Sequence, residues 1–359
     1  MAFDCYCALC GIGFSGLRIG SPSDATAERR RQYVQSVSRS LNESKDRPAL
    51  PQDGEESINS YDPRLVNRES IAWTSQVHCL GVHEVKGKNK AFVSGPGYYA
   101  DAGELAVKVG QRASRTYFNC YGFGTDETPG PVVPFHWCCF EILLQSLTGS
   151  TDIKNVDLDV LYQVMMDLVN GSGAALRLDY GDDVATAQGQ YWQCLPGTEY
   201  TVAHPTSTPD LSSFITTQLK DNANLHTLPK DFDLGTRNPV NPFKELPAEL
   251  VYQICSGLPG ESLKSLTNAS LFIHLLTRDD HFWRRFIESD MPWLWEAKVL
   301  REERETTGEL NHERVYAWLD TVTKPGYGLD DSQTMGVANR RRIWNACQGV
   351  VTAYRTACA

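Results

Sequence analysis

The chain has 359 residues, of which 41% are hydrophobic and 22% are charged, a composition typical of a globular protein long enough for two domains. Its formal net charge of -10 argues against a nucleic-acid partner, because phosphate contacts need clustered Lys and Arg. Neither a long apolar run nor a signal-peptide pattern occurs, so no membrane contact is expected. Eleven scattered cysteines are typical of reduced thiols, so we expect an intracellular protein of the cytoplasm, the nucleus or both.

The N-terminal segment contains half of a possible metal site. Cys7 and Cys10 enclose a two-residue turn followed by Gly11, a spacing at which two thiolates can take adjacent positions around a tetrahedral zinc ion. No second Cys-x-x-Cys pair occurs in the sequence, and Cys5 competes as a third thiol. The alternative is a strand with small buried thiols, since free cysteine packs as a small hydrophobe. Sequence alone leaves open which further ligands would complete the site among His78, Cys79, Cys120, His136, Cys138 and Cys139.

Polar and apolar patterns then alternate along the chain. Residues 28–39 are predicted to form a polar helix, and residues 42–57 are charged and nearly free of large apolar side chains, which indicates a mobile loop. Over residues 77–118, short apolar runs separated by turn signals predict a meander of strands.

Two helices are expected next. Residues 135–149 are apolar nearly all round, which predicts a buried helix. Its His136 lies close in sequence to Cys138 and Cys139, but no motif supports a catalytic Cys–His pair, so packing is the preferred interpretation. Asp157 is predicted to cap the second helix, and Asp182-Asp183 is interpreted as surface charge.

Residues 241–296 open with a short predicted helix. Pro247 suits the first helical position, where a missing N–H leaves no hydrogen bond unmade. Gly257 and the Pro259-Gly260 pair end this helix. The residues that recur at helical spacing and form one apolar stripe are Leu246, Leu250, Val251, Ile254 and Leu258.

Two more amphipathic segments follow in the same stretch. The second carries Leu263, Leu266 and Leu271. Asp279 and Asp280 supply N-cap oxygens for the third. Its apolar face consists of Phe282, Trp283, Phe286 and Ile287. Three short helices cannot cover this much apolar surface among themselves, so the stretch is predicted to bind a partner.

This order of elements resembles an F-box. It begins with Leu246-Pro247, continues with a Leu-x-x-Leu pair at Leu263 and Leu266, and reaches an aspartate-rich turn before Phe282-Trp283. Residues 290–296, DMPWLWE, are similar to the continuation in filamentous-fungal F-box proteins. The resemblance implies docking on the Skp adaptor of cullin–RING ubiquitin ligases. The residues it implies at the adaptor surface are Leu246, Pro247, Leu250, Ile254, Leu258, Leu263, Leu266 and Trp283.

The whole chain is therefore expected to have an α+β fold. Residues 1–235 would form a mixed α/β domain of short strands and buried helices, and this part more weakly resembles the N-terminal region of the same fungal proteins, in VHCLGV and FHWCCFEIL. A linker at 236–242, the F-box at 243–290 and a helical extension over 291–359 would follow. In that extension the Arg340–Arg342 run is interpreted as solvated or locally paired.

The expected function is that of a non-catalytic substrate receptor in a Skp–cullin–F-box ubiquitin ligase, with an unidentified protein target. No nucleophile elbow, P-loop, zinc-protease or kinase motif occurs in residues 1–235, so no catalytic residue is expected. No cofactor is expected apart from zinc at Cys7 and Cys10. Two alternatives stay open: an interaction module acting outside a ligase, and an N-terminal zinc-binding domain or unrecognised enzyme. Residues 267–270 favour the first alternative, because F-boxes usually place Val or Cys and a basic residue there.

Overall fold

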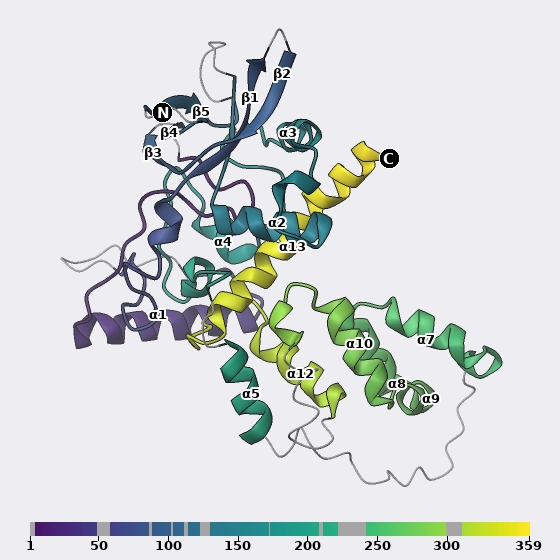
Figure 1. Ribbon diagram of the computed structural model, residues 1–359. Helices are drawn as coiled ribbons and strands as arrows, with labels where there is room; N and C mark the ends of the chain where they lie inside the picture. The colour runs from purple at the N-terminus through teal and green to yellow at the C-terminus, as the bar shows by residue number, and fades with distance from the viewer. Residues whose placement is uncertain are drawn as a thin grey trace. The chain divides into compact units, whose positions relative to one another are not determined.

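A computed structural model shows that the chain divides into two compact units, Met1–Thr208 with Pro325–Ala359, and Pro209–Lys324 (Figure 1). The described part contains eleven α-helices and two three-stranded antiparallel sheets, so the predicted α+β class is confirmed. The structure describes residues 4–48, 58–85, 88–101, 103–110, 114–122, 130–171, 173–207, 211–221, 242–298 and 311–359.

Both sheets belong to the first unit, and five of their six strands confirm the short strands predicted over residues 77–118, whereas the strand at 133–135 was not predicted. In the first sheet, Leu80 of the central strand is paired with Val93 on one side and Val133 on the other. In the second, Leu105 is paired with Tyr99 and Phe118. The first sheet has the order β2 (Lys88–Val93), β1 (His78–Val85), β6 (Val133–Phe135), and the second has the order β3 (Gly97–Asp101), β4 (Glu104–Val107), β5 (Thr116–Asn119).

The helices of the first unit surround a long C-terminal helix. Helix α13 (Met335–Cys358) packs against α2 (Trp137–Thr148), α3 (Leu158–Asp167) and the short 3₁₀ helix η3 (Glu199–Val202), and Figure 1 shows α13 alongside α2. Residues 325–359 therefore belong to the first unit, whereas the sequence was expected to continue as an extension of the F-box. The physical reason is that α13 buries apolar side chains from Met335 to Val351, including Val337, Ile343 and Val350.

The structure tests three further sequence interpretations in the first unit: the polar helix, the Asp157 cap and the Asp182-Asp183 pair. Helix α1 (Asp24–Asn42) contains the predicted polar helix, and the predicted Asp157 cap accepts hydrogen bonds from the first turn of α3. In helix α4 (Asp182–Ala187), Asp182 is exposed as interpreted, but the interpretation of Asp183 as surface charge is wrong. Asp183 is buried, pairs with Arg47 at 2.5 Å and accepts the Tyr200 hydroxyl at 2.8 Å.

The Arg340–Arg342 run was interpreted as solvated or locally paired, but Arg340 and Arg342 also bond to residues far away in the sequence. Arg340 and Arg342 are buried, and Arg340 donates from Nε to the Pro205 carbonyl oxygen at 2.7 Å. They tie α13 to the rest of the first unit. Residues 49–57 of the expected loop, and the expected linker except Pro242, lie outside the described residues.

The second unit is helical, and the expected F-box, residues 243–290, forms part of it. Its interior centres on an aromatic cluster in which Trp283 and Phe286 contact each other and Tyr316, and Phe282 contacts Trp283. Asp279 caps α10 as predicted, and Ser270 caps α9. The elements are α5 (Leu211–Asp221), η4 (Pro242–Glu245), α7 (Ala248–Ser256), α8 (Gly260–Ala269), α9 (Leu271–Leu276), α10 (Asp280–Asp290), η5 (Trp295–Lys298) and α12 (His312–Val322).

Among the helices of the described residues, none combines the length and the apolar character that crossing a membrane requires.

Candidate partner-binding residues and a buried cysteine–histidine cluster

Helix α7 is apolar on two sides, and only one of them is covered. Val251 and Cys255, one turn apart, are fully buried. Leu250 and Ile254, also one turn apart, are 46% and 43% exposed, and Leu246 just before the helix is 37% exposed. A short helix with one apolar face in the interior and a second one in solvent has the character of a binding element.

Helix α9 adds two more exposed apolar side chains. Leu271 and Leu275 are separated by one helical turn and are 41% and 50% exposed, whereas Ile273 between them is buried. Helices α7 and α9 contact each other within the second unit. The sequence interpretation did not assign Leu271 or Leu275 to a partner surface, although their i, i+4 spacing was a usable signal.

The eight residues expected at the adaptor surface fall into three groups. The structure exposes Leu246, Pro247, Leu250 and Ile254. Leu258 and Leu266 are half-buried. The other two are corrected, because Leu263 and Trp283 lie in the interior of the second unit. A side chain that already fills the interior stabilises the unit and cannot also cover a partner.

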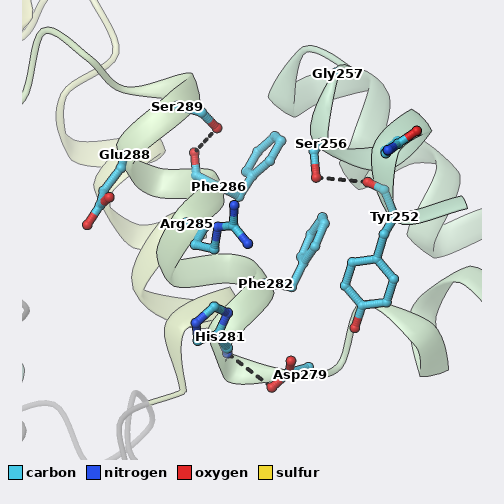
Figure 2. A pocket seen from close by; sticks show the side chains of 11 residues that line it. Tyr252, Ser256, Gly257, Asp279, His281, Phe282, Arg285, Phe286, Glu288 and Ser289 are labelled. Carbon is cyan, nitrogen blue, oxygen red and sulfur yellow. Dashed lines mark hydrogen bonds between the residues drawn. The ribbon is translucent and has the colours of Figure 1, made fainter. Parts of the chain in front are cut away.

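A hollow of about 680 Å³ lies between α7 and α10 (Figure 2). Figure 2 shows the rings of Phe282 and Phe286 directed towards Tyr252 and Ser256 across it, with charged side chains of α10 at its edge. Tyr252 and Ser256 each lie two residues from an exposed apolar residue of α7, which corresponds to about 200° around a helix. Gln253 and Gly257 also line the hollow, about 60° from the exposed residues, so the hollow extends from the far side of α7 towards its exposed apolar face.

A histidine–carboxylate hydrogen bond joins α10 to α12. The Nδ1 atom of His312 lies 2.6 Å from Asp280 Oδ1, and the His312 backbone N–H donates to the same oxygen at 3.0 Å. Burial alone would raise the pKa of Asp280, but the bonds from His312 outweigh it and lower that pKa below its ordinary value. The contact holds two helices of the second unit together.

The first unit contains a separate cluster that begins at the Cys7–Cys10 turn. The Cys7 N–H donates to the Ile12 carbonyl oxygen at 2.9 Å, and the Gly11 N–H donates to the Cys7 carbonyl oxygen at 2.9 Å. Gly11 has φ +74°, a backbone conformation that favours glycine. These bonds make a closed turn that brings both thiols to one side.

Strand β6 leads a histidine to this turn. The Ala8 N–H donates to the Pro134 carbonyl oxygen at 2.9 Å, so the turn lies beside β6, and His136 follows directly as the N-cap residue of α2. The ligand atoms of four fully buried residues, Cys7, Cys10, His136 and Cys139, lie within 4.8 Å of one another. The other sequence candidates, Cys5, His78, Cys79, Cys120 and Cys138, do not belong to this group.

The orientation of His136 is fixed by its second ring nitrogen. Nε2 lies 2.8 Å from the Thr74 carbonyl oxygen, which can only accept, so Nε2 donates to it, and in a neutral imidazole this leaves the lone pair on Nδ1. Nδ1 then faces Cys10 Sγ at 3.3 Å. Because all of these side chains are sealed from solvent, the arrangement suits a metal ligand set better than a Cys–His nucleophile.

No protein-family model, curated protein or solved structure was found to match this chain. Its function is therefore inferred from the two groups of residues above.

Proposed function

We propose that this chain is an F-box protein that docks on a Skp adaptor and acts as the substrate receptor of a Skp–cullin–F-box ubiquitin ligase. One observation carries the proposal: Leu250 and Ile254 of α7 are exposed, although the next residue after each of them already fills the interior. An apolar face of this kind gains free energy when a partner removes it from water.

The order of elements supports the choice of partner. The segment that resembles an F-box contains Leu246-Pro247 at the start of α7, then α8 and α9, and then α10 with its Asp279 cap.

Burial of this surface would supply part of the free energy that specific binding requires. Complete burial of one aliphatic side chain contributes about 2 kcal/mol. Leu246, Leu250, Ile254, Leu271 and Leu275 are each close to half exposed, so covering all five would contribute on the order of 5 kcal/mol before the entropic cost of association.

The proposed mechanism requires no catalytic residue in the chain. The second unit would hold the adaptor, and a target bound elsewhere on the chain would be kept near a ubiquitin-charged enzyme. The rate gain is one of effective concentration, since tethering converts an encounter between free molecules into an intramolecular one. The unidentified partner of this proposal is the target protein.

Calorimetric titration of the full chain with a Skp adaptor tests the proposal. Wild type is expected to bind, and a Leu246→Ala/Pro247→Ala/Leu250→Ala variant with unchanged circular dichroism is expected not to bind. The matched control is Leu41→Ala, because Leu41 of α1 is a similarly exposed leucine, at 43%, outside the second unit. A folded wild-type chain that does not bind the adaptor would contradict the proposal.

Addition of the cullin separates a ligase subunit from an interaction module acting outside a ligase. A ternary complex of chain, adaptor and cullin that co-elutes in gel filtration supports the ligase role. Binding to the adaptor that excludes the cullin would support the module instead.

A further inference from the structure

We propose that Cys7, Cys10, His136 and Cys139 bind one zinc ion in the first unit. Three thiolates and one imidazole form a ligand set that suits zinc in structural sites. Zinc–ligand bonds of about 2.0–2.3 Å in a tetrahedron place the ligand atoms roughly 3.4–3.8 Å apart. The 3.3 Å between Cys10 Sγ and His136 Nδ1 is close to the lower end of this range, and the whole set lies within 4.8 Å, about 1 Å wider than such a tetrahedron.

The backbone presents the ligands from two rigid elements. Cys7 and Cys10 occupy the closed N-terminal turn, where a side chain at Gly11 would approach Tyr180 Cγ at 2.7 Å, so the turn is packed tightly against its neighbours. His136 and Cys139 are three positions apart at the start of α2, a spacing that places both on one side of a helix. The N-terminal turn and the start of α2 therefore each supply two ligands to the same site.

The surroundings of His136 match the second shell of a metal ligand. A metal-bound histidine almost always donates its other ring N–H to a carboxylate, a carbonyl oxygen or water. Here that acceptor is the Thr74 carbonyl oxygen at 2.8 Å, and it leaves Nδ1 directed at the three sulfurs. The His136 backbone N–H also donates to Cys7 Sγ at 3.4 Å, a contact that favours the thiolate form.

A buried cation beside the turn is a second, independent reason to propose a negatively charged zinc–thiolate centre there. Arg342 of α13 is 5% exposed and donates to the carbonyl oxygens of Cys10 and Tyr180, at 2.8 and 3.0 Å, and to Asn339 Oδ1. All of these acceptors are neutral, and a buried charge is costly without a compensating one. Zn²⁺ bound to three thiolates has a net charge of -1, which would balance the guanidinium.

The four protein ligands would fill the tetrahedron, so the zinc has a structural role. They leave no position for water or substrate, which distinguishes the site from a catalytic zinc centre. Cys10 and His136 are 126 positions apart, so the metal would close a long loop and tie the N-terminal turn to α2. The free energy of zinc binding would then contribute to folding of the first unit.

Metal analysis of the full chain, purified under reducing conditions without chelator, tests the assignment. Mass spectrometry is expected to find a stoichiometric amount of zinc per chain. Cys7→Ser and Cys139→Ser are each expected to lose most of it, whereas Cys138→Ser is expected to retain it. Cys138 is the matched control because it is a buried thiol next to Cys139 that lies outside the cluster. Loss of zinc in Cys138→Ser to the same degree would count against the assignment.

Cobalt substitution of the wild-type chain is a second test, which does not depend on whether the serine variants fold. Wild-type chain reconstituted with Co²⁺ is expected to show thiolate-to-cobalt charge transfer and the visible absorption of tetrahedral cobalt. A folded, reduced chain without stoichiometric zinc and without this absorption would overturn the proposal, and the cluster would be packed thiols. Neither readout depends on adaptor binding.

Discussion

Leu250 and Val251 are consecutive residues of α7, yet Leu250 is 46% exposed and Val251 is fully buried. Successive residues of a helix point about 100° apart, so a single step along α7 leads from the interior to the solvent. Both residues are apolar, and only the surroundings differ. Substitution of one or the other therefore separates partner binding from folding.

Leu250→Ala is expected to weaken adaptor binding by about 30-fold, corresponding to roughly 2 kcal/mol for a central anchor. Its urea unfolding midpoint should stay close to that of wild type, because the removed atoms are largely in water already. Val251→Ala is expected to lower the free energy of unfolding by about 2 kcal/mol through loss of buried contacts. Calorimetry and urea titration on both variants check this pair of results. Equal destabilisation by the two substitutions would place Leu250 in the interior instead.

Gly260→Ala is expected to destabilise the second unit by about 1–3 kcal/mol through overpacking. A Cβ at this position would lie 1.6 Å from the Tyr316 hydroxyl, which donates to Asp290 Oδ2 at 2.8 Å, so Tyr316 must move and break that bond. Hydrogen exchange in α8 and α12 measures the effect.

Gly257→Ala is the matched control for this substitution. It lies three residues earlier, and the nearest atom to its added Cβ is the Gln253 carbonyl oxygen at 3.5 Å. We expect little change in exchange for this variant. Unchanged exchange in Gly260→Ala as well would mean that Tyr316 is not held in place by its neighbours.

Arg342→Leu is expected to destabilise the first unit by about 3 kcal/mol or more, since it leaves the carbonyl oxygens of Cys10 and Tyr180 buried without their donor. Arg341→Leu, at the adjacent half-buried position, should change the free energy of unfolding much less. Urea unfolding of the two variants, with exchange of first-unit peptides to localise the change, provides the comparison. A larger loss of unfolding free energy for Arg341→Leu than for Arg342→Leu would contradict the stabilising role assigned to Arg342.

Local patterns were sufficient to predict several elements. The Asp279 cap and the spacing of Phe282, Trp283 and Phe286 predicted α10, because capping and helical periodicity act within a few residues. The same periodicity identified Trp283 as apolar but not what would cover it, so its placement at an adaptor surface was wrong. Helical spacing specifies a face, and only tertiary contacts determine whether protein or solvent lies against it.

Long-range contacts explain what the sequence could not supply about the cysteine–histidine cluster. Cys7 and Cys10 were singled out by their spacing, but His136 and Cys139 were two of six open candidates. The choice depends on the Ala8–Pro134 backbone hydrogen bond, which joins segments more than a hundred residues apart and has no local signal. The position of Arg342 beside Cys10 depends in the same way on how α13 packs.

Glu199→Gln is expected to remove part of the pH dependence of stability in the first unit. Glu199 is 1% exposed, and burial raises its pKa although it accepts backbone N–H bonds from Asp62 and Gly197. Between the unfolded pKa, about 4.3, and the higher folded pKa, the folded state binds more protons than the unfolded state. The stabilisation is thus complete below the unfolded pKa and is lost as the pH rises through the folded pKa, by up to about 1.4 kcal/mol per pH unit.

The glutamine variant keeps the shape but cannot titrate, so its unfolding free energy should vary less over that window. One amide oxygen cannot replace both carboxylate oxygens as acceptors, so a constant loss of about 1 kcal/mol is expected in addition. Urea unfolding of wild type and variant at several pH values above about 4 measures both effects. The pKa of Asp62 is lowered, since its bonds to Arg64 outweigh burial, so it titrates below this window in both proteins. Parallel pH profiles would show that Glu199 is ionised in the folded state throughout.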